Sequence, residues 1–330
     1  MTVETQRFGD FGFAPVVGTY TPKFASLTPE TSIAGLSLQS QYLYGGFQGE
    51  SGAIYVLERK FIGPMTGGCY ILHNSGGRME LHEGSHRSAK GEMVRTIEPD
   101  SRRWVAKGML SGPHEEPIDL RITDDDLQWD EGGLISLRGS RPTLGAQFLT
   151  QMRDDPLAYA SQPYWLTGTI LGEAVEGPIF FDQVYFRHGS EWKEYPYYTD
   201  VQVVWNIFAN KYTDGTIEFG NITKGRGRWG AGIIVEGAIP VAEAARVGAE
   251  FDVDADGYVT GASYDLGPAG VWDFIGDPNQ QLSGFNKARW GGYRAQGGMT
   301  RRRGDDREVV TGWTWVEAFS DRMKDEELVR

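Results

Sequence analysis

The residue most suited to chemistry is an aspartate inside an otherwise apolar segment. Asp182 lies within Phe180–Phe186, between aromatic and aliphatic neighbours. A carboxylate that points inward from such a strand is desolvated, and desolvation raises its pKa towards the range useful for proton transfer near neutral pH. Asp182 is therefore our candidate general acid or base. The alternatives are an outward-facing residue on an edge strand and a buried structural hydrogen bond.

Other polar and aromatic residues of the same region complete the candidate site. A regular strand would separate Asp182 from His188 by roughly 20 Å, so the two are not a direct pair. We expect His188, Tyr185 and His73 to orient a substrate or to relay protons. The candidate substrate-binding residues are Trp165, Phe181, Gln183, Trp205, Tyr197 and Tyr198. Strand alternation puts Asp182 on one face, and Phe181, Gln183 and Tyr185 on the other.

A histidine cluster raises the alternative of a metal site. His73, His82 and His86 are close in sequence, and imidazole ligands suit zinc or iron. Gly84 interrupts the segment between the last two, so they need not share a helix face. We predict no metal, and keep a histidine-ligated metal-dependent lyase or oxygenase as the least favoured alternative.

Motifs for phosphate binding or covalent catalysis have little support. Residues 225–230 match G-x-G-x-x-G, but a strand-like segment follows where a dinucleotide site needs a helix. The single cysteine, Cys69, lies in a probable strand and reads as a small buried hydrophobe. We therefore predict neither an organic cofactor nor a covalent intermediate.

The elements that must position these residues are predicted to be strands. Turn signals such as Asp214-Gly215 and Asp256-Gly257 separate short apolar runs, and the glycine count is 45 of 330 residues. We predict a mostly antiparallel all-β chain with few short helices, at 143–153, 241–247 and 321–330. The pattern restarts after residue 190, which predicts two β domains, 1–190 and 191–330.

The charge and composition of the chain disfavour some classes of binding partner. The chain carries 32 basic and 45 acidic residues, a formal net charge of −13, which disfavours binding to nucleic acid. No uncharged apolar run approaches the length of a membrane span. With one cysteine and no leader pattern, we expect a cytoplasmic protein that does not insert into membranes. The oligomeric state stays open.

The middle strands resemble a known family. The glycine-punctuated segment 165–172, the run Phe181-Asp182-Gln183, and Trp205 followed by Asp214-Gly215 are similar to the AttH and carotenoid 1,2-hydratase group of lipocalin-like proteins. The resemblance implies two lipocalin-like β-barrel domains and chemistry on terpenoid or polyketide-like molecules, generally without an organic cofactor. Asp182 matches the family's aspartate, whereas Gln183 and Tyr185 stand where histidine and tryptophan are usual.

Together these observations predict an enzyme that transfers protons to an apolar substrate. We expect a cofactor-independent lyase, hydratase or isomerase that acts by general acid–base chemistry on a terpenoid, steroid or polycyclic aromatic. The alternative from another class is a non-catalytic carrier of hydrophobic ligands, because barrels can enclose a ligand with no chemistry attached.

Overall fold

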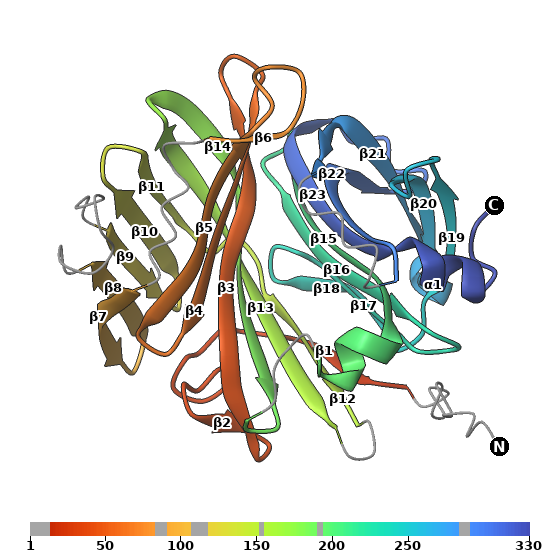
Figure 1. The fold of residues 1–330 in the computed structure, drawn as a ribbon, viewed down its shortest axis with the longest axis horizontal. Coiled ribbons are helices and arrows are strands. Elements are labelled where there is room, and N and C mark those ends of the chain that lie inside the picture. The colour runs from red at the N-terminus through yellow and green to blue at the C-terminus, as the bar shows by residue number, and fades with distance from the viewer. Residues whose placement is uncertain (1–13, 83–90, 107–117, 152–154, 190–193, 284–290) are drawn as a thin grey trace.

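The protein consists of two antiparallel β-sheets that lie side by side (Figure 1). The structure, a computed structural model, describes residues 14–82, 91–106, 118–151, 155–189, 194–283 and 291–330. The first sheet contains β1 (Val16–Tyr20), β2 (Ser32–Ile33), β3 (Leu36–Gly49), β4 (Ile54–Ile62), β5 (Met65–His73), β6 (Glu80–Leu81), β7 (Gly91–Glu98), β8 (Ser101–Ala106), β9 (Ile118–Thr123), β10 (Asp126–Glu131), β11 (Ile135–Ser140), β12 (Gly145–Thr150), β13 (Leu157–Ile170) and β14 (Glu173–Phe186).

The second sheet follows in the chain. It contains β15 (Gln202–Tyr212), β16 (Ile217–Gly225), β17 (Gly230–Glu236), β18 (Ile239–Ala244), β19 (Gly248–Val253), β20 (Val259–Asp265), β21 (Val271–Gln281), β22 (Tyr293–Arg302) and β23 (Val309–Phe319). Helical structure in the described residues is limited to α1 (Ser320–Asp325), a π-helical turn (Tyr197–Val201) and a 3₁₀ turn (Gly267–Ala269). The predicted all-β fold with few short helices is confirmed.

Strand pairing curls the first sheet into a ring. Its strands pair in the order β13-β11-β10-β9-β8-β7-β5-β4-β3-β14, and β14 pairs again with β13. The second sheet runs β18-β17-β16-β15-β23-β22-β21-β20-β19 and stays open between its edge strands. The predicted boundary between residues 190 and 191 falls outside the described residues, so the division into two domains stays a prediction.

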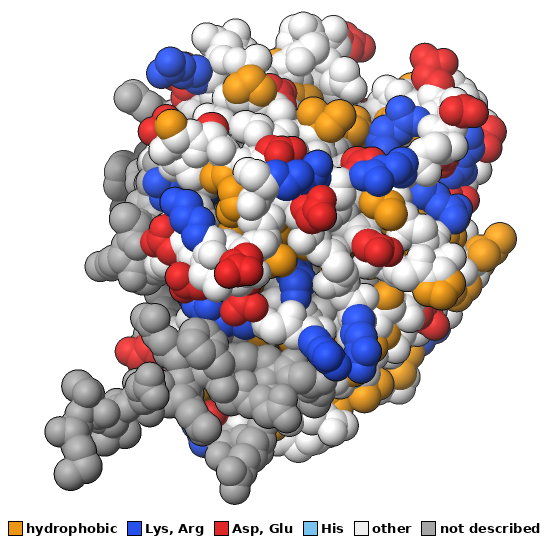
Figure 2. All heavy atoms as spheres, turned by 90° about the vertical axis from the view of Figure 1, so that its right-hand side faces the viewer, with side chains coloured by type: hydrophobic (Ala, Val, Ile, Leu, Met, Phe, Trp, Pro, Cys, Tyr) orange, Lys and Arg blue, Asp and Glu red, His pale blue; other side chains and the backbone are white. Residues whose placement is uncertain are grey.

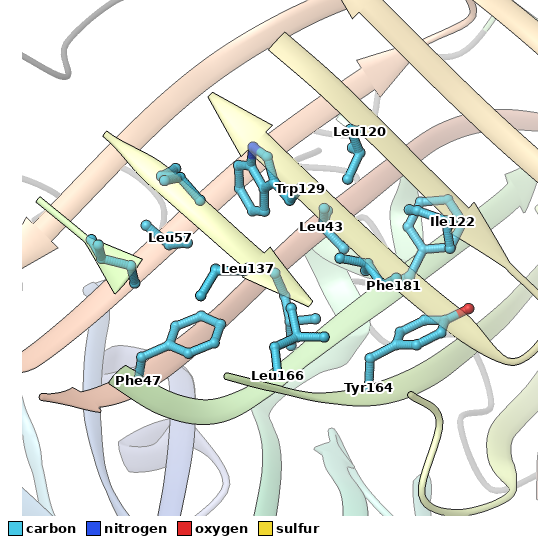
Figure 3. Packing of buried hydrophobic residues seen from close by; sticks show 14 of the residues in the cluster. Leu43, Phe47, Leu57, Leu120, Ile122, Trp129, Leu137, Tyr164, Leu166 and Phe181 are labelled. Atoms are coloured by element: carbon cyan, nitrogen blue, oxygen red, sulfur yellow. The ribbon is translucent and has the colours of Figure 1, made fainter. Parts of the chain in front are cut away.

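Each sheet buries an apolar core on its concave side. In the first sheet, Leu43, Phe47, Trp129, Leu137, Leu166 and Phe181 point towards one another inside the ring (Figure 3). In the second, a separate cluster includes Phe208, Ile222, Val316 and Trp272. The opposite faces of both sheets are also apolar in part, because they pack against each other.

The contact between the sheets depends on a glycine. Trp313 of β23 stacks on Phe180 of β14, with ring centroids 6.3 Å apart. A Cβ atom at Gly46 of β3 would lie 2.2 Å from the Trp313 ring. Only a residue without a side chain therefore lets the tryptophan of the second sheet approach the first.

Two of the three predicted helices are wrong. Residues 145–150 form β12, which pairs with both β1 and β13, and residues 239–244 form β18, which pairs with β17. Both segments are held in extended form by neighbouring strands, and tertiary pairing of this kind overrides local propensity. The third expectation is partly confirmed, because α1 covers Ser320–Asp325.

Among the described residues, none of the helices has the length and apolar composition needed to cross a membrane. The face of the molecule in Figure 2 carries basic and acidic side chains that are interspersed.

Candidate functional site

A cavity of about 730 Å³ lies between the two sheets. The first sheet contributes side chains from β3, β4, β5, β12, β13 and β14, and the second contributes side chains from β15, β22 and β23. The π-helical turn that precedes β15 adds two tyrosines. The aromatic residues that line it are Tyr42, Tyr44, Phe148, Tyr159, Phe186, Tyr197, Tyr198, Trp205, Tyr293 and Trp315. The charged residues that line it are Glu58, Lys60, Asp182 and Glu317.

Asp182 lies on the wall of this cavity, in the middle of β14. Its strand is paired on both sides, with Ser161 of β13 and Tyr42 of β3 opposite Asp182. Asp182 is 5% exposed, and its Oδ2 accepts a hydrogen bond of 2.9 Å from the hydroxyl of Tyr44. Its Oδ1 is buried and has no hydrogen bond of normal geometry within the described residues. The hydroxyls of Ser161 and Tyr159 also interact with the carboxyl group, but neither forms a hydrogen bond of normal geometry with Oδ1.

Burial dominates the electrostatics of Asp182. Desolvation, with a smaller contribution from the charge of Glu317, raises the pKa of its carboxyl from 3.8 to about 7. The nearby hydroxyls of Ser161, Tyr159 and Tyr44 act in the opposite direction but do not offset the burial. Asp182 is thus poised to exist in both protonation states near neutral pH, as an acid–base catalyst requires.

Two glutamates that were not predicted from the sequence share the cavity with Asp182. Burial and the charge of Glu317 raise the pKa of Glu58 from 4.5 to about 7, whereas Lys60 lowers it. Burial also raises the pKa of Glu317, against hydrogen bonds from Trp315 and Tyr293. Glu58 belongs to the first sheet and Glu317 to the second, so the two carboxylates come from opposite walls.

The sequence around Glu317 indicates an inward-facing residue more clearly than the sequence around Glu58 does. Glu317 shares a strand face with Trp313 and Trp315, and this alternation could have marked it as inward-facing. Glu58 is followed by Arg59 and Lys60, a pattern that suggests a solvated strand. Only the packing of the second sheet over β4 makes it half-buried.

Three of the predicted substrate-binding residues line the cavity. Trp205, Tyr197 and Tyr198 all do so, and Val184 and Phe186 share the cavity face with Asp182 as strand alternation predicts. Trp205 lies opposite Glu317 in the pairing of β15 with β23. The approach of the two sheets brings these aromatic side chains to Asp182.

Other predicted substrate-binding residues lie elsewhere. Phe181 points into the core of the first sheet (Figure 3). Gln183 is fully buried on the same side of β14 and accepts a hydrogen bond from Tyr185. Trp165 packs between the sheets outside the cavity lining and donates to Glu176 Oε1 at 2.6 Å. A ligand in this cavity cannot contact Phe181 or Gln183 directly, because alternate residues of a strand face opposite sides.

The structure does not bring the other three predicted catalytic residues to Asp182. The hydroxyl of Tyr185 donates to Pro29 O at 2.9 Å on the opposite side of β14. His188 is exposed beyond the end of that strand. His73 ends β5 and contacts Ser75 Oγ at 2.6 Å, outside the cavity lining. Tyr44, on the neighbouring strand, is the tyrosine that contacts Asp182, and the sequence did not single it out.

The histidine cluster is only partly described. The rings of His73 and His82 have centroids 6.0 Å apart, and His86 lies outside the described residues. Within the part of the chain that the structure describes, no three histidine, cysteine, aspartate or glutamate residues are grouped to hold a metal ion.

Two solved structures match this chain at low sequence identity. No protein-family profile and no curated protein matches the chain. A solved structure of a "putative AttH" from Nitrosomonas europaea is 12% identical, with a TM-score of 0.46, over 93% of this chain and 100% of that one. Kievitone hydratase from Nectria haematococca is 10% identical, with a TM-score of 0.41, over 94% of this chain and 98% of that one.

Proposed function

We propose that the protein is a cofactor-independent hydratase, lyase or isomerase, with Asp182 as general acid or base. Its substrate is a bulky apolar small molecule held between the two sheets. The observation that carries the proposal is a buried carboxyl group, with its pKa raised to about 7, on the wall of an aromatic-lined cavity of about 730 Å³. Ligand sites in proteins commonly combine such an apolar lining with a few convergent polar groups.

Addition of water illustrates how the site would work. The protonated Asp182 gives its proton to one carbon of a substrate double bond, and a C–H bond forms. A water oxygen bonds to the other carbon and loses a proton to an ionised carboxylate, for which Glu58 and Glu317 are in place. The reverse sequence eliminates water. An isomerisation needs a carboxylate to remove a proton from one carbon of the substrate and a carboxylic acid to give a proton to another carbon, with no water added.

Tyr44 is a positioning residue in this scheme. Its hydroxyl donates to Asp182 Oδ2, which fixes the carboxyl plane and leaves Oδ1 on the unbonded side. The hydrogen bond also stabilises the ionised form of Asp182, which lowers its pKa.

The test is proton exchange from solvent. The protein is incubated in D₂O with a panel of unsaturated terpenoids, steroids and polycyclic phenols, and products are analysed by mass spectrometry. Hydration adds the mass of one D₂O, and isomerisation replaces hydrogen by deuterium. We expect Asp182→Asn to abolish the change in mass while retaining ligand binding. A carrier instead would bind panel members with no change in mass in either protein.

A further inference from the structure

The charges in the cavity are unbalanced. Three carboxyl groups line it, those of Glu58, Asp182 and Glu317, and Lys60 is the one basic side chain among the described lining residues. Lys60 Nζ lies over the ring of Tyr42, 5.2 Å from its centroid. Its charge lowers the pKa of Glu58 but does not offset the burial and the charge of Glu317. With all these groups ionised, the cavity would hold more negative charge than positive.

Aromatic side chains flank each of the two glutamates. Tyr44 lies opposite Glu58 in the pairing of β3 with β4, and Trp205 lies opposite Glu317 in the pairing of β15 with β23. The indole nitrogen of Trp315 also donates to Glu317 Oε1 at 3.3 Å. Aromatic faces next to carboxylates are the environment in which proteins bind ammonium groups, through cation–π attraction and charge. The contact between Lys60 and Tyr42 already shows one such pairing in the cavity.

An unsatisfied buried group supplies a second observation. Asp182 is 5% exposed, lines the cavity, and keeps Oδ1 without a hydrogen bond of normal geometry in the described structure. The hydroxyl of Tyr159, also 5% exposed and part of the cavity lining, interacts with Asp182 and Ser161 but likewise lacks a hydrogen bond of normal geometry. Buried polar atoms are normally hydrogen-bonded with good geometry, and a ligand with a polar group can provide the better-placed partner that these two atoms lack.

We propose that the cavity binds a cationic amphiphile: a bulky apolar molecule that carries a protonated amine, held between Glu58 and Glu317. The proposal rests on the proposed function because it names the ligand class of the same site. The ring system of the ligand occupies the aromatic part of the cavity, and its ammonium group lies between the carboxylates of the two walls. The same carboxylates disfavour an anionic ligand.

Binding of a cation is coupled to proton release. The titratable groups that face Glu58 are Glu317, Lys60 and Tyr293. Those that face Glu317 are Glu58, Asp182, Tyr44, Tyr198 and Tyr293. Near pH 7 the carboxyl groups of Glu58 and Asp182 are partly protonated, because their pKa values are raised to about 7, and a neighbouring ammonium group favours their ionised forms. The ligand therefore displaces protons, and its affinity rises as the pH increases from 5 to 8.

Three fluorescent probes with one skeleton test the proposal: 4-(pyren-1-yl)butylamine, the corresponding butan-1-ol and the corresponding butanoic acid. Binding is measured by fluorescence titration, and by calorimetry at pH 7 in phosphate and in Tris, whose different ionisation enthalpies report proton release. We expect the amine to bind on the order of tenfold more tightly than the alcohol, the acid to bind most weakly, and only the amine to release protons.

Variants locate the effect. Glu317→Gln and Glu58→Gln should each reduce the preference for the amine, with binding of the alcohol retained as evidence that the cavity is intact. Glu250→Gln, on the surface of β19, is the matched control and should bind like the parent protein.

The outcomes separate this proposal from the proposed function. Equal binding of amine and alcohol, or a preference that both cavity variants retain, overturns the cationic ligand class while leaving the apolar cavity and Asp182 chemistry standing. Failure of all three probes to bind overturns it together with the ligand-binding cavity. Tight binding of the amine with proton release supports the cationic ligand class even where the D₂O experiment detects no reaction.

Discussion

Replacing Asp182 by asparagine is expected to stabilise the protein at alkaline pH, although the same change removes the proposed catalytic group. Asparagine has nearly the same shape, and its oxygen can still accept the hydrogen bond from Tyr44. What changes is that the buried side chain no longer ionises. The free energy of unfolding should therefore respond to pH differently in the two proteins.

The magnitude follows from the pKa of Asp182. In the unfolded chain the carboxyl has its ordinary value of 3.8, and in the folded protein burial raises the pKa to about 7. Below pH 3.8 the group is protonated in both states. Between pH 3.8 and 7 the unfolded state ionises first, so stability falls with rising pH, by about 1.4 kcal/mol per unit. Across the whole window the loss is about 4 kcal/mol, and it is absent from Asp182→Asn.

The assay is urea denaturation of both proteins from pH 4.5 to 8.5. The difference between the two free energies of unfolding isolates Asp182, because Glu58 and the other titrating groups are present in both proteins. We expect the free energy of unfolding of Asp182→Asn, relative to that of the parent protein, to rise steadily up to about pH 7. Above that pH the difference should stay constant. A variant that is less stable by the same amount at every pH would refute the reasoning, because Asp182 would then be ionised and fully satisfied in the folded protein.

Three further substitutions test the hydrogen bond to Asp182, the contact between the sheets and a buried ion pair. Tyr44→Phe removes the hydroxyl that lowers the pKa of Asp182, so the pH profile of turnover should move upward and turnover should fall roughly tenfold. Gly46→Ala places a Cβ 2.2 Å from the Trp313 ring, and urea denaturation should show a loss of about 1–3 kcal/mol. Glu131 forms an ion pair with Arg59 inside the first sheet, where both side chains are buried. Glu131→Gln leaves Arg59 charged and without its ionic partner, and the same assay should show a loss of about 3–5 kcal/mol.

Each of these has a control within the chain. Tyr42→Phe changes a tyrosine of the same cavity wall that does not bond Asp182, so an equal shift of the pH profile would contradict the role of Tyr44. Gly18→Ala brings a Cβ no closer than 3.9 Å to Glu243, so a loss of stability equal to that of Gly46→Ala would contradict the packing argument. Replacing Arg59 and Glu131 together by apolar residues should recover stability, and a further loss would contradict the unpaired-charge argument.

Local pattern was sufficient for most of the secondary structure and for one catalytic candidate. Asp-Gly and Gly-Gly turns separate the strands, and the two-residue period of β14 correctly put Asp182 with Val184 and Phe186. The same period put Tyr185 on the far side, where the structure places it. The segments at 145–150 and 239–244 were mistaken for helices because the strands that pair with them, β13 among them, are not visible in a local window.

The sequence by itself determined the strand periodicity, the acidic balance and the presence of one carboxylate among aromatic residues, because these properties depend on neighbours along the chain. Only the tertiary structure decided which faces became a cavity. Strands β3, β4 and β14 meet β15, β22 and β23 across the gap between the sheets, which brings Tyr44, Glu58 and Glu317 to Asp182 from distant parts of the chain. The raised pKa values of these carboxyl groups follow from that burial and from their mutual repulsion, and neither can be read from a strand in isolation.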